Sequence, residues 1–108
     1  MFTTRIAWEN IRSIDSATFT GSFQTLGTPL LFPSYKIKMV NNSTVLVTVS
    51  INGTDAIDVA PSNSFWLYDE TVTTNHEGLP KGTQIYVSGT AGTGLVYLVS
   101  QYLKPLGT

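Results

Sequence analysis

The sequence contains no cysteine and only one histidine, and these scarcities remove several kinds of site at once. Without thiols the chain offers no disulfide and no thiolate metal ligand, which leaves its redox compartment open. Charged residues make up 12% of the chain, against about 25% in ordinary proteins. The formal net charge is −1 and no basic run is present. The chain therefore lacks the cluster of basic side chains that would neutralise nucleic-acid phosphates, and we expect no nucleic-acid partner.

Long apolar runs are missing as well. No segment approaches the ~20 apolar residues of a membrane helix, and the N-terminus has no apolar core of signal-peptide length. We therefore expect a protein made in the cytoplasm, without a membrane partner.

Hydroxyl side chains take the place of the missing charge. The 108 residues suit one domain with one modest core, and they include sixteen threonines and ten serines. Threonine is β-branched and fits a pleated, half-exposed surface. Such a weakly charged β surface repels its own copies little, and neighbours in an assembly can cover it.

Alternation with a period of two dominates the middle of the chain. Ile37 and Met39 oppose Lys36 and Lys38, and the set at 45, 47, 49 and 51 is the cleanest apolar row. We expect a turn at 41–43 and a type I′ hairpin turn at Asn52-Gly53. Segments 84–88 and 95–102 complete seven to nine short strands. The fold class predicted is all-β: a single antiparallel, jelly-roll-like β-sandwich.

The N-terminal part is less regular, because the isoleucines at 6, 11 and 14 fit neither the helical nor the strand period. We expect a short helix or an extended arm there. Residues 1–16 are thus assigned to an N-terminal arm or first short element, and residues 17–108 to the sandwich domain.

Three constellations are candidates for chemistry, and each favours a structural interpretation. His76 lies in a polar stretch with too few ligands for a transition-metal site, so we expect an exposed loop histidine. Asp55 and Asp58 suggest calcium or a glycosidase pair, but no calcium-loop pattern is present and aspartate is common at turns. The glycine run at 89–94 precedes a strand, not a helix, which predicts a hairpin tip rather than a phosphate loop. We expect no catalytic residue, no cofactor and no bound metal.

The aromatic residues carry the interaction hypothesis. In the segment 65–68, Phe65 and Leu67 share one face, so Trp66 and Tyr68 share the other. Either both faces are buried, or Trp66 and Tyr68 meet a partner; the segment 95–102 is also apolar on both faces. Aromatic patches are favoured at protein–protein interfaces and can also stack on sugars. The interface candidates are Trp8, Trp66, Tyr68, Tyr97 and Tyr102.

Several segments, taken in order along most of the chain, resemble small virion proteins of tailed double-stranded DNA bacteriophages. These are residues 11–13, 19–30, 40–43, 47–53, 61–65, 68–69 and 79–87. The resemblance implies a β-sandwich present in many copies on the virion, which decorates or cements the capsid or sits at the neck or tail. Its implied partners are further copies of itself and the major capsid, portal, neck or tail proteins.

The leading hypothesis is therefore a non-enzymatic, self-associating virion structural protein. The alternative is a carbohydrate- or receptor-binding module on the virion, with Trp66, Tyr68 and the loop 69–82 facing a host-surface glycan. A small hydrolase lacks both a triad and a useful carboxylate pair.

Overall fold

The computed structural model describes residues 4–69 and 79–105 as nine strands and one short 3-10 helix. The strands are β1 (Thr4–Trp8), β2 (Arg12–Asp15), β3 (Gln24–Thr25), β4 (Lys36–Ser43), β5 (Val47–Ser50), β6 (Asp58–Ala60), β7 (Ser64–Asp69), β8 (Tyr86–Ser88) and β9 (Gly94–Pro105), and the helix is η1 (Ser16–Thr18). No helix in these residues is long and apolar enough to cross a membrane.

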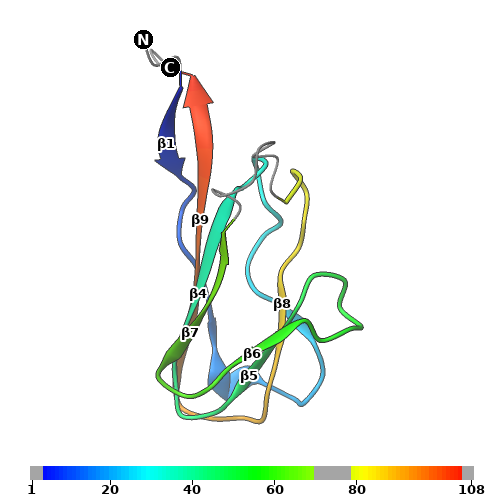
Figure 1. Cartoon of the computed structure of the whole chain (residues 1–108). Helices are drawn as coiled ribbons and strands as arrows, with labels where there is room; N and C mark the ends of the chain where they lie inside the picture. The colour runs from blue at the N-terminus through cyan, green and yellow to red at the C-terminus, as the bar shows by residue number, and fades with distance from the viewer. Residues whose placement is uncertain (1–3, 70–78, 106–108) are drawn as a thin grey trace.

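Two antiparallel sheets face each other (Figure 1). One has five strands in the order β1-β9-β4-β7, with β2 also on β9; the other has four in the order β3-β8-β5-β6. The pairs are nested along the chain: β5 with β6, β4 with β7, β3 with β8, and β2 with β9. A long hairpin folded over itself in this way is a jelly roll. The predicted β-sandwich is confirmed.

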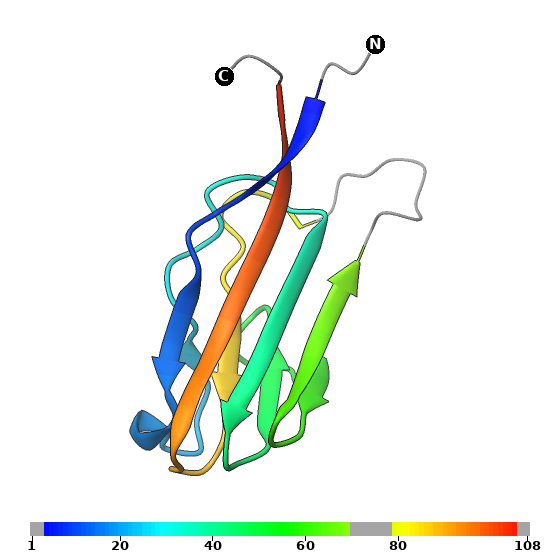
Figure 2. The ribbon, with the colours of Figure 1, turned by 90° about the vertical axis from the view of Figure 1, so that its left-hand side faces the viewer.

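The twelve-residue strand β9 organises the five-stranded sheet. Its first eight residues pair with β4 on one side, while β2 and then β1 pair in succession along the other side. Beyond Gln101 only β1 accompanies it, and this two-stranded end extends past the rest of the sandwich (Figure 2). The segment around 6–14 therefore holds two extended strands rather than a helix, because β9 supplies hydrogen bonds to both of them.

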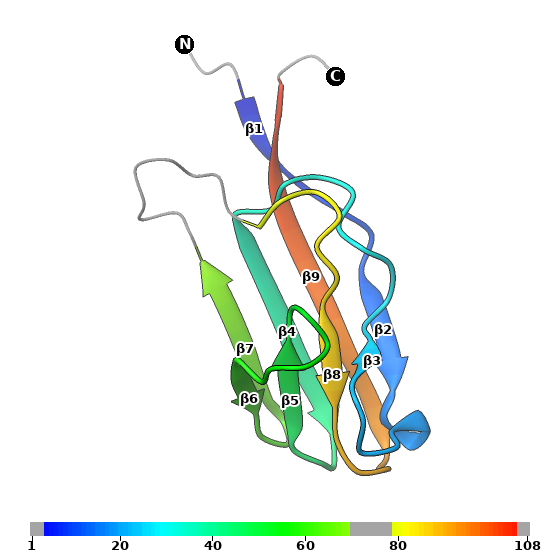
Figure 3. The same cartoon turned by 90° about the vertical axis from the view of Figure 1, so that its right-hand side faces the viewer.

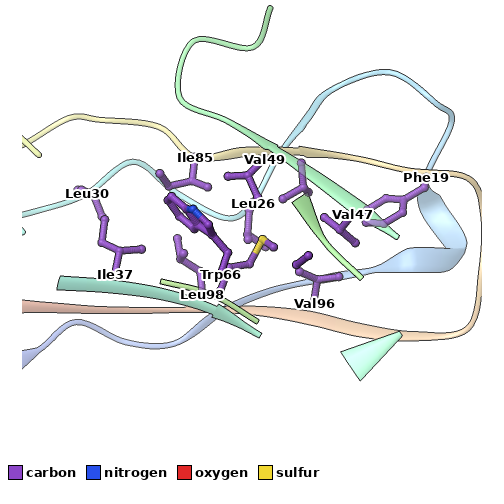
Figure 4. Close-up of a cluster of buried hydrophobic side chains, with 13 residues drawn as sticks. Phe19, Leu26, Leu30, Ile37, Val47, Val49, Trp66, Ile85, Val96 and Leu98 are labelled. Carbon is purple, nitrogen blue, oxygen red and sulfur yellow. The ribbon is translucent and has the colours of Figure 1, made fainter. Parts of the chain in front are cut away.

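The core lies between the sheets and is built from the inward-facing half of each alternating strand (Figure 4). Ile37 and Met39 point inward from β4, opposite Val47 and Val49 of β5, as the alternation predicts. The buried cluster is Phe19, Leu26, Leu30, Ile37, Met39, Val47, Val49, Ala60, Trp66, Ile85, Val87, Val96 and Leu98.

Three predicted turns are wrong in their details. Strand β4 runs through the expected turn at 41–43, because the buried Asn41 amide finds partners inside the sandwich. Asn52-Gly53 is not a type I′ turn, since only Gly53 has a positive φ. The Asn52 Oδ1 instead accepts from the amides of Thr54 and Asp55, within the longer loop between β5 and β6. The glycine run at 89–93 is no hairpin tip: it crosses from β8 in one sheet to β9 in the other.

Candidate interaction surface

The outward face of the five-stranded sheet is apolar along most of its strands. Alternation sends Val40 outward from β4, in register with Phe65 of β7 and Tyr97 of β9. Phe65 is 58% exposed. Further exposed apolar side chains on this side are Ile6, Trp8, Leu67 and Leu103. We call this surface the apolar face; nothing in the described part of the chain covers it.

Two lysines interrupt the apolar face. Lys38 of β4 lies in register between Leu67 of β7 and Val99 of β9. Lys36 lies between Asp69 and Gln101, and Trp8 continues that row from β1. Together they line a shallow hollow of about 340 Å³, formed by Trp8, Lys36, Lys38, Leu67, Val99 and Gln101. We call it the lysine hollow.

Of the two alternatives for Trp66, burial or contact with a partner, the structure shows burial, so Trp66 is not an interface residue. It is only 8% exposed and packs within the buried cluster (Figure 4). Tyr68 faces the same way and packs, partly buried, against that cluster. The exposed side of β7 is therefore the Phe65 and Leu67 side. Burying the indole between the sheets removes more apolar area from water than burying either of those two side chains.

The three other aromatic candidates differ in their surroundings. Trp8 is 60% exposed at the rim of the lysine hollow. Tyr97 lies half-buried on the apolar face. Tyr102, an odd number of residues further along β9, points to the opposite side of the sheet and stacks on Phe32 with ring centroids 4.1 Å apart. Only Trp8 and Tyr97 of the five candidates thus share the apolar face.

A buried ion pair, which the sequence did not reveal, joins the link between β1 and β2 to the loop before β4. The Arg12 Nη2 donates to the Glu9 Oε1 at 2.7 Å, and both side chains are almost fully buried. The carboxylate also accepts the amides of Leu31 and Phe32, one on each oxygen. Apart from Arg12, every partner of the Glu9 carboxylate belongs to a loop some twenty residues further along the chain, so no local sequence motif predicts the ion pair. We call this pair and its hydrogen bonds the Glu9–Arg12 clamp.

The arginine side of the clamp is equally well satisfied. The Arg12 Nε donates to the Thr28 carbonyl at 2.8 Å, and Nη2 donates to the Pro29 carbonyl at 3.0 Å. Its aliphatic stem runs across Gly27, where a Cβ would lie 2.7 Å from it. A buried charge that finds all its partners costs little, whereas one that loses a partner costs several kcal/mol. The clamp therefore fixes β2, and with it the start of the five-stranded sheet.

A second exposed patch lies at the other side of the sandwich, along residues 55–59. Asp55 and Asp58 are exposed, and Ile57 and Val59 beside them are 48% and 47% exposed. Asp55 is held by the Asn52 amide at 2.9 Å, and Asp58 accepts the Val59 amide at 2.8 Å. We call residues 55–59 the acidic edge. Its two carboxylates stay free for a partner on their remaining lone pairs.

The described residues contain no cluster of three or more acidic or histidine side chains that could hold a metal ion. Asp55 and Asp58 stand without a third such ligand there. His76 and most of the polar loop at 69–82 lie outside the described residues. Burial, and then the negative charge of Asp69, raises the pKa of the Tyr35 hydroxyl above its ordinary value of 10.0, so this group stays neutral at physiological pH.

Together these features define a jelly-roll sandwich with one apolar face that residues 4–69 and 79–105 leave uncovered. No protein-family model and no curated protein sequence matches the chain. Among solved structures, it is similar to a protein of the Bacillus endospore appendages, described as a novel family of disulfide-linked pili. The TM-score is 0.52 at 13% identity, over 94% of this chain and 90% of that chain. The SPBc2 prophage-derived protein YomS is similar with a TM-score of 0.42 at 10% identity, over 96% and 97% of the two chains. At these identities the likeness to the pilus protein shows the fold.

Proposed function

We propose that this chain is a non-enzymatic structural protein of a tailed-bacteriophage virion, where its copies associate with one another and with the capsid, neck or tail. The observation that carries the proposal is the apolar face. Its exposed side chains come from β1, β7 and β9, and the half-buried Val40 of β4 joins Phe65 of β7 to Tyr97 of β9 in one cross-strand row. Contiguous apolar surface of this kind marks protein contact sites, because covering it gains about 25 cal/mol per Å².

Two further observations support the same role. The chain resembles small virion proteins of tailed phages along most of its length. The Bacillus appendage protein shares its fold and builds a pilus, so this sandwich can serve as a repeated building block. That pilus is disulfide-linked, whereas this chain has no cysteine. Disulfides therefore cannot link its copies to one another, and we expect their association to depend on protein concentration and on salt.

The platform suggested for carbohydrate binding is not on the surface, which disfavours that alternative. Trp66 is in the core, and a ring buried between two sheets offers no face to a sugar. An exposed platform would need different aromatic residues from the ones that suggested it.

The proposal is tested on purified virions of the phage that encodes the chain. We expect the protein to co-purify with the particles and to form oligomers in sedimentation velocity as its concentration rises. Its copy number by quantitative mass spectrometry then distinguishes hundreds of copies, for shell decoration, from six, twelve or a small multiple, for neck or tail. A protein that stays monomeric at high concentration and is absent from the particles contradicts the proposal.

A further inference from the structure

We propose that copies of this chain associate head to tail, with the acidic edge of one copy seated in the lysine hollow of the next. This inference rests on the proposed self-association and names the two surfaces that carry it.

The lysine hollow combines positive charge with apolar walls. Lys38 is flanked in register by Leu67 and Val99, and neither Lys36 nor Lys38 forms an ion pair within the described part of the chain. Lys36 has the carboxylate of Asp69 beside it in register, whereas Lys38 has no acidic neighbour on β7 or β9, so a second copy placed with its hollow directly over this one would oppose the two Lys38 side chains. Like charges opposed at an interface repel each other, so this symmetric arrangement is disfavoured. The occupant must combine apolar side chains with carboxylates.

A surface of that composition is present on the chain itself. The described carboxylates are those of Glu9, Asp15, Asp55, Asp58 and Asp69. Glu9 is buried in the clamp, while Asp15 and Asp69 belong to strands of the five-stranded sheet and so lie on the hollow's own side. Asp55 and Asp58 remain, and they flank the exposed Ile57. The acidic edge thus has the same mixed character as the hollow, with the opposite sign.

The five-stranded sheet, which carries the apolar face, forms one side of the sandwich, and the loop between β5 and β6 projects from the opposite side (Figures 1 and 3). The acidic edge of one molecule cannot reach the hollow of the same molecule, but each copy offers one hollow and one edge. A contact between two different surfaces is heterologous, and its repetition gives a ring if the rotation closes or an open filament if it does not. Both outcomes suit a protein present in several adjacent copies.

Charge reversal tests the pairing. We expect Lys38→Glu and Asp58→Lys each to weaken self-association of the full chain, raising the apparent dissociation constant by about tenfold or more in sedimentation velocity at ~50 mM salt. Equimolar mixing of the two variants restores association, because each then supplies the complement of the other. The double variant Lys38→Glu/Asp58→Lys associates on its own. Lys81→Glu, the same change at an exposed lysine outside the hollow, is the control and leaves association unchanged.

The outcomes separate this inference from the proposed function. Because both side chains are exposed, thermal melting of every variant should match the wild type, which excludes misfolding as the cause of a loss. If the wild type forms oligomers and both single variants do so equally well, the head-to-tail pairing is wrong while self-association stands. If Lys38→Glu loses only its attachment to particles, the hollow holds another virion protein and the pairing is also wrong. A wild type that is monomeric at all concentrations overturns both.

Discussion

The outward faces of the two sheets share one period and differ in chemistry. On the four-stranded sheet the outward side chains of the paired residues are mostly hydroxyl-bearing, with Thr48 in register with Ser88 and Thr25 with Tyr86. The loop between β5 and β6 lies over this sheet, and a Cβ at Gly53 would stand 3.2 Å from the Tyr86 ring. On the five-stranded sheet the corresponding positions carry Phe65, Leu67, Trp8 and valines, interrupted by Lys36 and Lys38, and no segment of the described chain covers them.

This difference shows how a chain with little charge divides its surface. Hydroxyl groups keep water as a partner, so a threonine-rich face costs little when it is left open. An aliphatic or aromatic face gains free energy only when something covers it. The chain covers part of the four-stranded sheet with its own loop, whereas none of the described residues covers the apolar face. The following predictions test this division, starting with the largest effect.

Arg12 and Lys38 are cations of the same sheet on opposite sides of it, and their loss should have very different consequences. Arg12→Met leaves the Glu9 carboxylate buried without its counter-charge, which we expect to lower the free energy of unfolding by about 3–5 kcal/mol. Lys38→Met removes an exposed charge that forms no ion pair with the described residues, and it should change the free energy of unfolding by less than about 0.5 kcal/mol. Urea unfolding measures both. Arg12→Met/Glu9→Gln should be less destabilised than Arg12→Met; equal loss in the two would show that the ion pair is not what matters.

Asn41 links the two sheets, so its removal tests whether they act as one unit. Its Nδ2 donates to the carbonyls of Ala60 in β6 of the other sheet, of Pro61 just after β6, and of Val45 in the link between β4 and β5. Asn41→Ala removes the donor from the buried Ala60 carbonyl, although Val45 keeps the Ser43 hydroxyl, and we expect a loss of about 2–3 kcal/mol in urea unfolding. The neighbouring Asn42 is exposed, and Asn42→Ala is the matched control with a loss below about 0.5 kcal/mol. Similar losses at the two positions would contradict the role given to Asn41.

Gly53 tests how closely the loop covers the four-stranded sheet. It has φ of +80°, and Gly82 has φ of +89° with nothing within 4 Å of a built Cβ. Valine at either position meets the strain of a positive φ, about 1–3 kcal/mol. Only at Gly53 does it also press on the Tyr86 ring. Gly53→Val should therefore lower the melting temperature further than Gly82→Val; equal shifts would mean that the loop does not rest on Tyr86.

The fold was largely predictable from the sequence because alternation is a local signal. Ile37, Met39, Val47 and Val49 were expected to share inward faces, and all four are buried. The segment 65–68 shows the limit of that signal. Its two faces are both apolar, and a period of two does not say which of them turns inward.

The parts that sequence reasoning missed depend on distant partners. The Glu9–Arg12 clamp exists because the carbonyls of residues 28 and 29 and the amides of 31 and 32 come to it through the tertiary fold. Asn41 reads as a turn residue from its neighbours, yet its amide is satisfied by carbonyls four to twenty residues away. A polar residue predicts a turn only where no buried partner competes for it.

Two substitutions that barely change stability test the two outward faces directly, because each one gives a face the chemistry of the other. Leu67→Thr makes the apolar face more hydroxyl-rich, and Thr48→Val makes the four-stranded face more apolar. Leu67 is 44% exposed and Thr48 is partly exposed. We expect each variant to unfold within about 0.5 kcal/mol of the wild type. Self-association in sedimentation velocity should weaken for Leu67→Thr, which loses a wall of the lysine hollow, and stay unchanged for Thr48→Val. If Thr48→Val altered association and Leu67→Thr did not, the contact would involve the four-stranded sheet without the lysine hollow, and the head-to-tail pairing would be wrong.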